Sequence, residues 1–318
     1  MSRVGLVLGG GGITGAAIHF GSLLALRMAT DWDPNDSEVI IGTSSGAFAA
    51  AMIRGDRLDL ETLVGDAHNR TEVADRLSSY IYRRTRPKGL ARWVRRGLIP
   101  GIIKPNLELT LGSPAIHTTD GIAEWVAEML GPLGDMWPDK PTVIVGFDLE
   151  SRQRIPFGTE AAPPVPLKLA VAASAAVPFV FQPVKIQGRW YADGGIASGT
   201  SADLLLANPE PLDLVIVVAP LAAEDARPGT RIIDSMFDRV GRTALDAELA
   251  VIADAWPQTD VIVLRPDSRV LAASRPNPLS VKAAVPTFLR TLMSMRDELS
   301  HPETWELLEK HLGVAVSP

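Results

Sequence analysis

The chain has 318 residues, of which 46% are hydrophobic and 21% are charged, and its formal net charge is -6. This composition is that of a globular protein with a sizeable core, and the acidic balance argues against a general nucleic-acid-binding protein. The sequence contains no cysteine, which excludes structural disulfides, thiolate nucleophiles and cysteine-ligated metal sites.

The first predicted element is a buried strand at the apolar stretch Val4–Leu8. It runs into four consecutive glycines, Gly9–Gly12, and a helix is expected over residues 15–28. Glycines between a strand and a helix leave several backbone N–H groups free to point at one place, as an oxyanion requires. The residues expected to form such an oxyanion hole are Gly10, Gly11 and Gly12.

A second strand is predicted near residues 38–41, followed by Gly42-Thr43-Ser44-Ser45-Gly46 and a helix over residues 45–53. This G-x-S-x-G motif lies where a strand ends and a helix begins, the position of a nucleophile elbow. In such an elbow a sharp turn presents the serine Oγ outward. The sequence therefore predicts Ser44 as the nucleophile of a serine hydrolase.

The glycine loop also allows a different interpretation. Gly10-x-Gly12-x-x-Gly15 fits the fingerprint of dinucleotide-binding, Rossmann-like proteins. Those proteins place an acidic residue at the end of the second strand, where it binds the ribose hydroxyls. Here Ser44 follows that strand, and the nearby acidic residues come before it. Dinucleotide binding through this loop is the alternative hypothesis.

A strongly basic segment extends over residues 76–107. Leu90, Trp93, Val94 and Leu98 recur there at helical spacing, beside arginines. Helices of this kind bind anionic lipid surfaces, although a solvated basic face over a buried stripe gives the same pattern. We expect peripheral contact with an anionic membrane through this segment, which has no acidic residue and nine basic ones: Arg76, Arg83, Arg84, Arg86, Lys88, Arg92, Arg95, Arg96 and Lys104.

The rest of the chain alternates strands with helices, which predicts an α/β fold. No internal repeat or linker is evident, so we expect one domain over residues 1–318. No stretch is predicted to span a membrane and no leader peptide is recognised at the start, so the expected location is cytoplasmic. The expected strands are 142–147, 152–157, 184–186, 190–192, 214–218 and 261–264, and the expected helices 58–77, 119–130, 168–176, 232–255, 281–299 and 303–312.

The general base is harder to find in the sequence. A conventional triad needs a histidine after the nucleophile, and of the five histidines only His301 and His311 lie late in the chain. Asp193 is the better candidate. It ends a predicted hairpin strand, and Gly194 and Gly195 allow a tight turn that orients its carboxylate, although an ordinary Asp-Gly turn has the same pattern.

Four blocks occur in the order found in patatin-like phospholipases, and the chain resembles that family over about residues 3–206. The resemblance implies a three-layer α/β fold, with a mostly parallel central sheet covered by helices on both faces. A weaker fifth block is Gly146-Phe147-Asp148-Leu149. The four blocks are Gly9 to Leu23, Gly42 to Gly46, Ala173 to Pro183 and Asp193 to Leu204.

The resemblance further implies a serine esterase that hydrolyses acyl esters of lipids, of phospholipase A or lysophospholipase type. Ser44 would be the nucleophile and Asp193 the base of a dyad that uses no histidine, metal or other cofactor. The chain departs from the family at Thr14, where a basic residue is usual, and this favours a neutral or differently headed acyl ester. A non-catalytic protein that binds a membrane or partner is a further alternative, against which the presence of both dyad residues argues.

Overall fold

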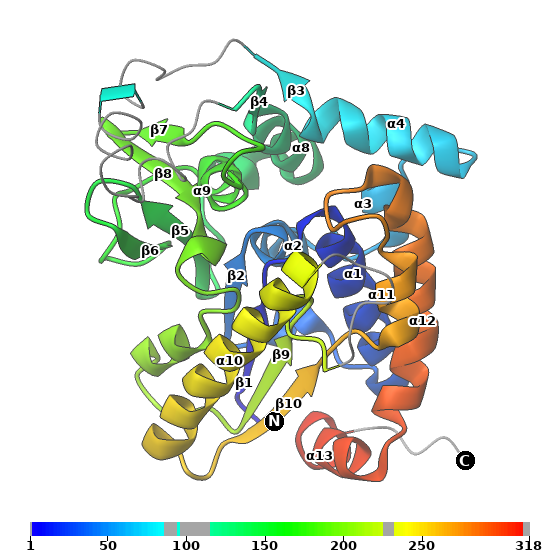
Figure 1. Cartoon of the computed structure of the whole chain (residues 1–318). Helices are drawn as coiled ribbons and strands as arrows, with labels where there is room; N and C mark the ends of the chain where they lie inside the picture. Colours follow the sequence, from blue (N-terminus) through cyan, green and yellow to red (C-terminus); the bar gives the residue numbers. More distant parts are fainter. Residues whose placement is uncertain (1, 86–93, 96–114, 225–231, 314–318) are drawn as a thin grey trace.

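The computed structural model describes residues 2–85, 94–95, 115–224 and 232–313 (Figure 1). Most of the predicted basic segment, residues 86–93 and 96–107, lies outside these ranges. Its contact with a membrane therefore stays a prediction.

The described strands form a central sheet in the order β10-β9-β1-β2-β5-β8-β7, with β6 also paired to β5. From β10 to β5 all neighbours are parallel, while β6, β7 and β8 are antiparallel additions. This confirms the predicted mostly parallel sheet. The strands are β1 (Val4–Leu8), β2 (Val39–Thr43), β5 (Thr142–Asp148), β6 (Gln153–Phe157), β7 (Val184–Ile186), β8 (Arg189–Asp193), β9 (Leu214–Val218) and β10 (Asp260–Leu264).

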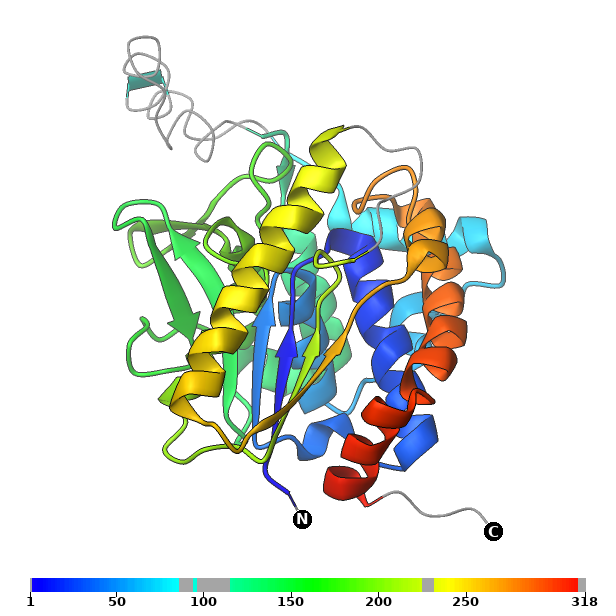
Figure 2. The same ribbon diagram turned by 60° about the horizontal axis from the view of Figure 1, so that its bottom comes forward.

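The pleat of the strands divides their side chains between two cores. Leu6 and Leu8 pack on the side of α1 (Gly12–Thr30) and α2 (Ser45–Arg54), whereas Val7 packs on the side of α10 (Ile232–Ala255). Figure 2 shows α10 lying across one face of the sheet, with α1 and α12 (Ala284–Leu299) beyond the other. Burial on both faces explains why the central strands are continuous apolar runs in the sequence.

Two predicted helices differ most from those observed. The helix expected over residues 15–28 begins at Gly12, so the glycine loop is itself the N-terminus of α1. The helix expected over residues 58–77 is two helices, α3 (Leu60–Val64) and α4 (Arg70–Ile81). Gly65, at φ 54°, ends the first, and the Asn69 side chain caps the second by accepting the N–H groups of Thr71 and Glu72.

The remaining elements are short or peripheral. A two-stranded ladder, β3 with β4, lies apart from the main sheet. The elements not yet given are β3 (Arg83–Arg84), β4 (His117–Thr118), α8 (Asp120–Leu130), α9 (Leu167–Ser174), α11 (Ser268–Ala273), α13 (Pro302–Leu312) and the 3₁₀ helices Pro34–Asp36, Gly131–Asp135, Gly194–Ile196, Ala202–Ala207 and Val281–Ala283.

By length and composition α1 is apolar enough to cross a membrane, which the sequence analysis did not expect of any stretch. Most of α1 is buried, and it packs along α12. At Gly21 the two helices approach so closely that a Cβ atom would lie 2.9 Å from Cβ of Thr291. These contacts are those of a core helix.

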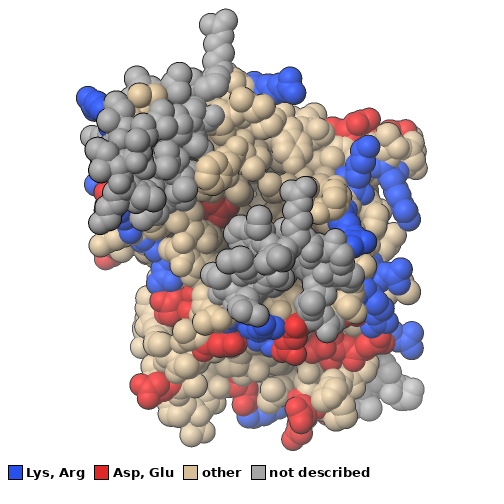
Figure 3. Space-filling model, in the orientation of Figure 1, with Lys and Arg blue, Asp and Glu red and all other residues tan. Residues whose placement is uncertain are grey.

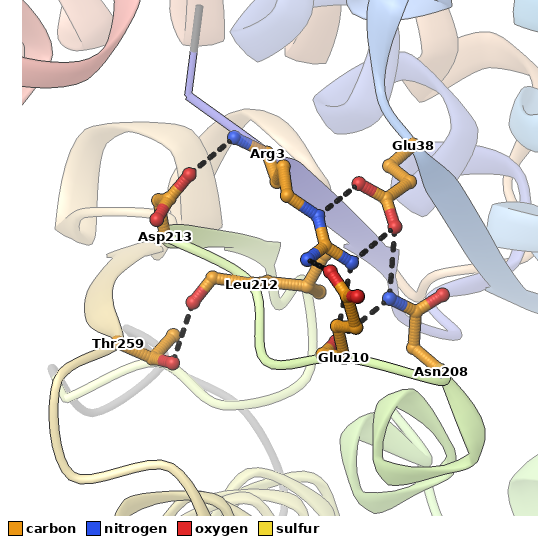
Figure 4. A network of polar contacts seen from close by, with 7 residues as sticks. All are labelled: Arg3, Glu38, Asn208, Glu210, Leu212, Asp213 and Thr259. Atoms are coloured by element: carbon orange, nitrogen blue, oxygen red, sulfur yellow. Dashed lines mark hydrogen bonds and ion pairs between the residues drawn. The ribbon is translucent and has the colours of Figure 1, made fainter.

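The amino ends of β1, β2 and β9 are tied together by Arg3 (Figure 4). Its guanidinium donates two hydrogen bonds of 2.8 Å to Glu38, and its backbone N–H donates one of 2.7 Å to Asp213. Because Glu38 precedes β2 and Asp213 precedes β9, this network links the amino ends of three central strands. These ends lie opposite to the carboxyl ends, where the site is predicted.

Candidate active site

Ser44 lies on the sharp turn between β2 and α2, as the motif predicts. Its backbone has φ 55° and ψ -117°, a conformation that is strained for any residue other than glycine. Glycine is required on both sides because of close packing. A Cβ atom at Gly42 would lie 2.5 Å from the Gly46 carbonyl oxygen, and one at Gly46 would lie 1.9 Å from the Leu8 carbonyl oxygen. The two glycines of the motif therefore allow the elbow to pack directly against β1.

Ser174, from the third sequence block, holds this turn in place. Its hydroxyl accepts the backbone N–H of Ser44 at 2.9 Å and donates to the Val145 carbonyl at 2.6 Å. Since Val145 belongs to β5, the elbow is anchored to the neighbouring strand as well as to its own. The sequence analysis gave Ser174 no role beyond its place in the family block.

Asp193 ends β8, which pairs with β5 so that Asp193 lies opposite Gly146. Its Oδ1 accepts the N–H of Gly195 at 2.7 Å. Burial raises the pKa of Asp193 to about 6, while the Ser44 hydroxyl and the Gly195 N–H partly counteract this by stabilising the charged form. The structure thus brings Ser44 and Asp193 together as buried partners, although their motifs are far apart in the chain.

The glycine loop approaches Ser44 directly, since a Cβ atom at Gly10 would lie 3.5 Å from Cβ of Ser44. The N–H of Gly10 is occupied: it donates to the Gly199 carbonyl at 2.7 Å. Of the three predicted oxyanion donors, this leaves Gly11 and Gly12, whose N–H groups lie at the N-terminus of α1. The helix dipole there favours negative charge.

The N-terminus of α2 meets that of α1 at the same place. A Cβ atom at Gly15 would lie 2.6 Å from Oγ of Ser45, so the first turns of the two helices are in contact. The first N–H groups of a helix have no partner within the helix. Two positive helix ends therefore converge beside the Ser44 side chain, an arrangement suited to a developing oxyanion.

His19, which the sequence left without a role, supports the glycine loop. Its Nε2 lies 2.6 Å from the carbonyl oxygen of Gly9, and because that oxygen can only accept, Nε2 carries the proton. The ring is fully buried, which lowers the pKa of His19 to about 4. His19 is therefore a neutral hydrogen-bond donor to the loop.

None of the five histidines forms a hydrogen bond with Ser44 within the part of the chain that the structure describes. His311 lies next to Asp260 at 2.7 Å and to Ser2 at 3.0 Å. Asp260 pairs with Leu214 at the amino end of β10, whereas Ser44 follows the carboxyl end of β2. His311 is thus at the opposite edge of the sheet.

A cavity of about 70 Å³ opens at Ser44 and is lined almost wholly by apolar atoms. Phe48 and Trp125 form part of its wall, with ring centroids 4.4 Å apart, and residues of α1 and Phe181 are among the other lining residues. Figure 3 shows this face of the molecule hollowed near its middle, with uncharged residues around much of the described rim. An apolar cavity beside the Ser44 hydroxyl suits an acyl chain and does not suit the pyrophosphate and ribose of a dinucleotide.

Thr14, the departure from the family pattern, is buried at the start of α1, and its N–H donates to the Pro278 carbonyl at 3.0 Å. It offers no charge to a ligand. Among the described residues, no group of three or more histidine, aspartate or glutamate side chains is placed to hold a metal ion.

Comparison with known proteins identifies relatives of this chain. Uncharacterized NTE family proteins of Mycobacterium bovis and Mycobacterium tuberculosis are 29% identical to it over 213 residues, which is 64% of this chain and 48% of theirs. The chain therefore spans about half the length of these relatives.

Two solved structures are similar to this chain at low TM-scores. VipD from Legionella pneumophila has a TM-score of 0.41 and 16% identity, and the match covers 98% of this chain and 67% of that one. Human GIVD cytosolic phospholipase A2 in complex with methyl gamma-linolenyl fluorophosphonate has a TM-score of 0.41 and 13% identity, covering 98% and 60%.

A family model described as patatin-like phospholipase matches residues 6–206, which is well over half of the chain. The match contains the glycine loop, the elbow, Ser174 and Asp193. The chain belongs to the patatin-like phospholipase family.

Proposed function

We propose that this protein is a serine hydrolase of lipid acyl esters, of phospholipase A or lysophospholipase type, and that Ser44 and Asp193 are its catalytic dyad. The observation that carries the proposal is the strained Ser44 elbow beside the buried Asp193 carboxylate, at the mouth of an apolar cavity. A carboxylate with a pKa near 6 is a better base than an exposed one and is still charged at neutral pH.

In the proposed reaction, the Oγ of Ser44 attacks the ester carbonyl carbon and its proton passes to Asp193. The carbonyl oxygen becomes an oxyanion, which the N–H groups of Gly11, Gly12 and Ser45 stabilise. Collapse of this intermediate breaks the ester C–O bond, and the alcohol leaves with the proton from Asp193. Water then attacks the acyl-enzyme with Asp193 as base, which releases the fatty acid and restores Ser44.

The cavity supports an acyl chain as the part of the substrate that binds deepest. The head group would remain toward the mouth, and Thr14, at the position where the family usually has a basic residue, is buried and supplies no positive charge. We therefore expect the acyl chain to dominate recognition, with little dependence on a phosphate at this position.

The test is labelling with a fluorophosphonate probe, followed by mapping of the modified peptide. Ser44→Ala should abolish labelling and the hydrolysis of p-nitrophenyl esters while leaving the thermal midpoint nearly unchanged. Ser151→Ala, at an exposed turn, is the matched control and should behave as wild type. Labelling of another serine in Ser44→Ala would refute the assignment, and an unlabelled, inactive wild type would favour a non-catalytic binding protein.

We also propose that the rim of the cavity contacts a lipid surface. Phe179 lies between two cavity-lining residues, Val177 and Phe181, yet is 65% exposed and has φ 67°, which is unusual for an aromatic residue. Ile116 is 50% exposed, and its neighbour His117 pairs with Phe181. Exposed aromatic and aliphatic side chains beside the mouth of a lipid site are suited to entering a bilayer interface.

Phe179→Asn tests this contact without disturbing the turn, because asparagine tolerates a positive φ. It should weaken sedimentation with phosphatidylglycerol–phosphatidylcholine vesicles and slow hydrolysis on vesicles, while turnover of a soluble short-chain ester is unchanged. Met293→Asn, at a 64% exposed position on α12, is the matched control for loss of exposed apolar surface. Equal vesicle binding by both variants and wild type would contradict the proposal.

A further inference from the structure

Glu248 is a buried carboxylate on helix α10, on the face that packs against the sheet. Leu245 and Ile252 lie on either side of it at helical spacing and are buried in the core. A carboxylate at such a position is unfavourable unless donors satisfy its oxygens. The sequence predicts this helix only as residues 232–255, and Glu248 takes no part in the proposed reaction.

The Glu248 carboxylate holds the turn formed by residues 198–202. Its Oε2 accepts the Thr200 hydroxyl at 2.6 Å and the Ala202 N–H at 2.8 Å, and its Oε1 accepts the Ser198 hydroxyl. The Ser198 oxygen in turn accepts the N–H groups of Thr200 at 3.2 Å and Ser201 at 3.1 Å. One side chain from α10 thus fixes both the side chains and the backbone of the turn.

This turn touches the glycine loop at two points. The carbonyl of Gly199, between the two hydroxyl-bearing residues, accepts the N–H of Gly10 at 2.7 Å. The Thr200 methyl group packs on Gly9, where a Cβ atom would lie 3.1 Å from it. Since Gly10 approaches Ser44 closely, any shift of the turn moves the loop relative to the nucleophile.

We propose that Glu248 is a positioning residue for the oxyanion hole. By fixing the 198–202 turn, it keeps the Gly10 N–H directed to Gly199 and so leaves those of Gly11 and Gly12 facing the carbonyl oxygen of a substrate at Ser44. This inference rests on the proposed function. It also extends the site to α10, which lies outside residues 6–206 that the family model matches.

Two variants weaken the network, and a third controls for loosening of the same region. Glu248→Gln removes one acceptor, and Thr200→Val keeps the shape of the side chain but removes its hydroxyl donor. Asp203→Asn is the control, because Asp203 follows the turn and pairs with Arg154, and it contributes none of the hydrogen bonds that Glu248 accepts. The readouts are kcat and KM on a soluble p-nitrophenyl ester, and hydrogen exchange of the peptide containing residues 9–15.

Glu248→Gln and Thr200→Val should each lower kcat by about 10-fold or more, with KM changed by less than about twofold, because oxyanion stabilisation acts in the transition state. Both should speed exchange in residues 9–15. Asp203→Asn should keep kcat within about twofold of wild type even where its thermal midpoint falls.

The inference would be overturned if both network variants kept the wild-type kcat and the wild-type rate of hydrogen exchange in residues 9–15. If Glu248→Gln does not fold, the result for Thr200→Val decides. An equal loss of kcat in Asp203→Asn would also overturn it, since general loosening would then be the cause. The proposed function fails in a different way, through a wild-type protein that the fluorophosphonate probe leaves unlabelled.

Discussion

Asp193→Asn should make the protein inactive and, at neutral to alkaline pH, more stable. Burial raises the pKa of this carboxyl from 3.8 to about 6. At pH 8 the group is charged in both the folded and unfolded states, and the folded state bears the unfavourable cost of the buried charge. As pH falls toward 3.8 the carboxyl becomes protonated first in the folded state and then in both states, and that cost disappears. Stability from this group is therefore present at low pH and is lost as pH rises through 6.

The size of the effect follows from the shift. Raising the pKa from 3.8 to about 6 corresponds to a loss of roughly 3 kcal/mol of folding free energy when the group is charged. This is the net loss, because the hydrogen bonds from Ser44 and Gly195 already offset part of the desolvation penalty. Asparagine is nearly isosteric, and its oxygen can still accept the Gly195 N–H. We expect the midpoint of thermal unfolding to rise by about 5 °C at pH 8 and the difference from wild type to vanish near pH 4.

The assay is thermal unfolding of wild type and Asp193→Asn between pH 4 and 8.5, with ester turnover measured on the same samples. Asp148→Asn is the matched control. Asp148 is also buried, which opposes its ionisation, but Arg189 and two backbone N–H groups outweigh this and lower its pKa. This control should therefore lose stability throughout the range. A destabilised Asp193→Asn at pH 8, or a pH-independent difference, would refute the assignment of Asp193 as a buried charged base.

Further predictions concern the base, the cavity and the membrane. The value of kcat/KM on a soluble ester should rise with pH up to about 6, as Asp193 loses its proton, and a profile without this limb would contradict its role. Replacing His301 and His311 with Gln should leave most activity, whereas a folded but inactive variant would favour a conventional triad. Trp125→Leu should shift preference toward longer p-nitrophenyl esters, because it removes part of the cavity wall; an unchanged chain-length profile would argue against acyl binding there. If residues 76–107 bind anionic membrane, vesicle binding should increase with acidic lipid and weaken with salt, and equal binding to neutral vesicles would reject this.

The glycine loop shows what a local sequence pattern can predict and what it cannot. Four glycines after a strand predicted a set of backbone donors near the nucleophile, and the loop does lie against Ser44. Which N–H groups are free was not predictable, because the acceptor of the Gly10 N–H is a carbonyl at Gly199, on a distant turn. Glu248 gave one usable signal, a carboxylate within the apolar stripe of a helix, but its partners come from another part of the chain.

The sequence by itself determined the strands of the main sheet, the elbow and the order of the family blocks. These depend on local chemistry: apolar runs form buried strands, and only glycine fits where Gly42 approaches the Gly46 carbonyl within the same turn. The tertiary structure alone decided the site. Asp193 reaches Ser44 because β8 pairs with β5 beside β2, and its pKa is raised because that position is buried. Strand pairing between distant segments and burial are properties of the whole fold, which no local pattern specifies.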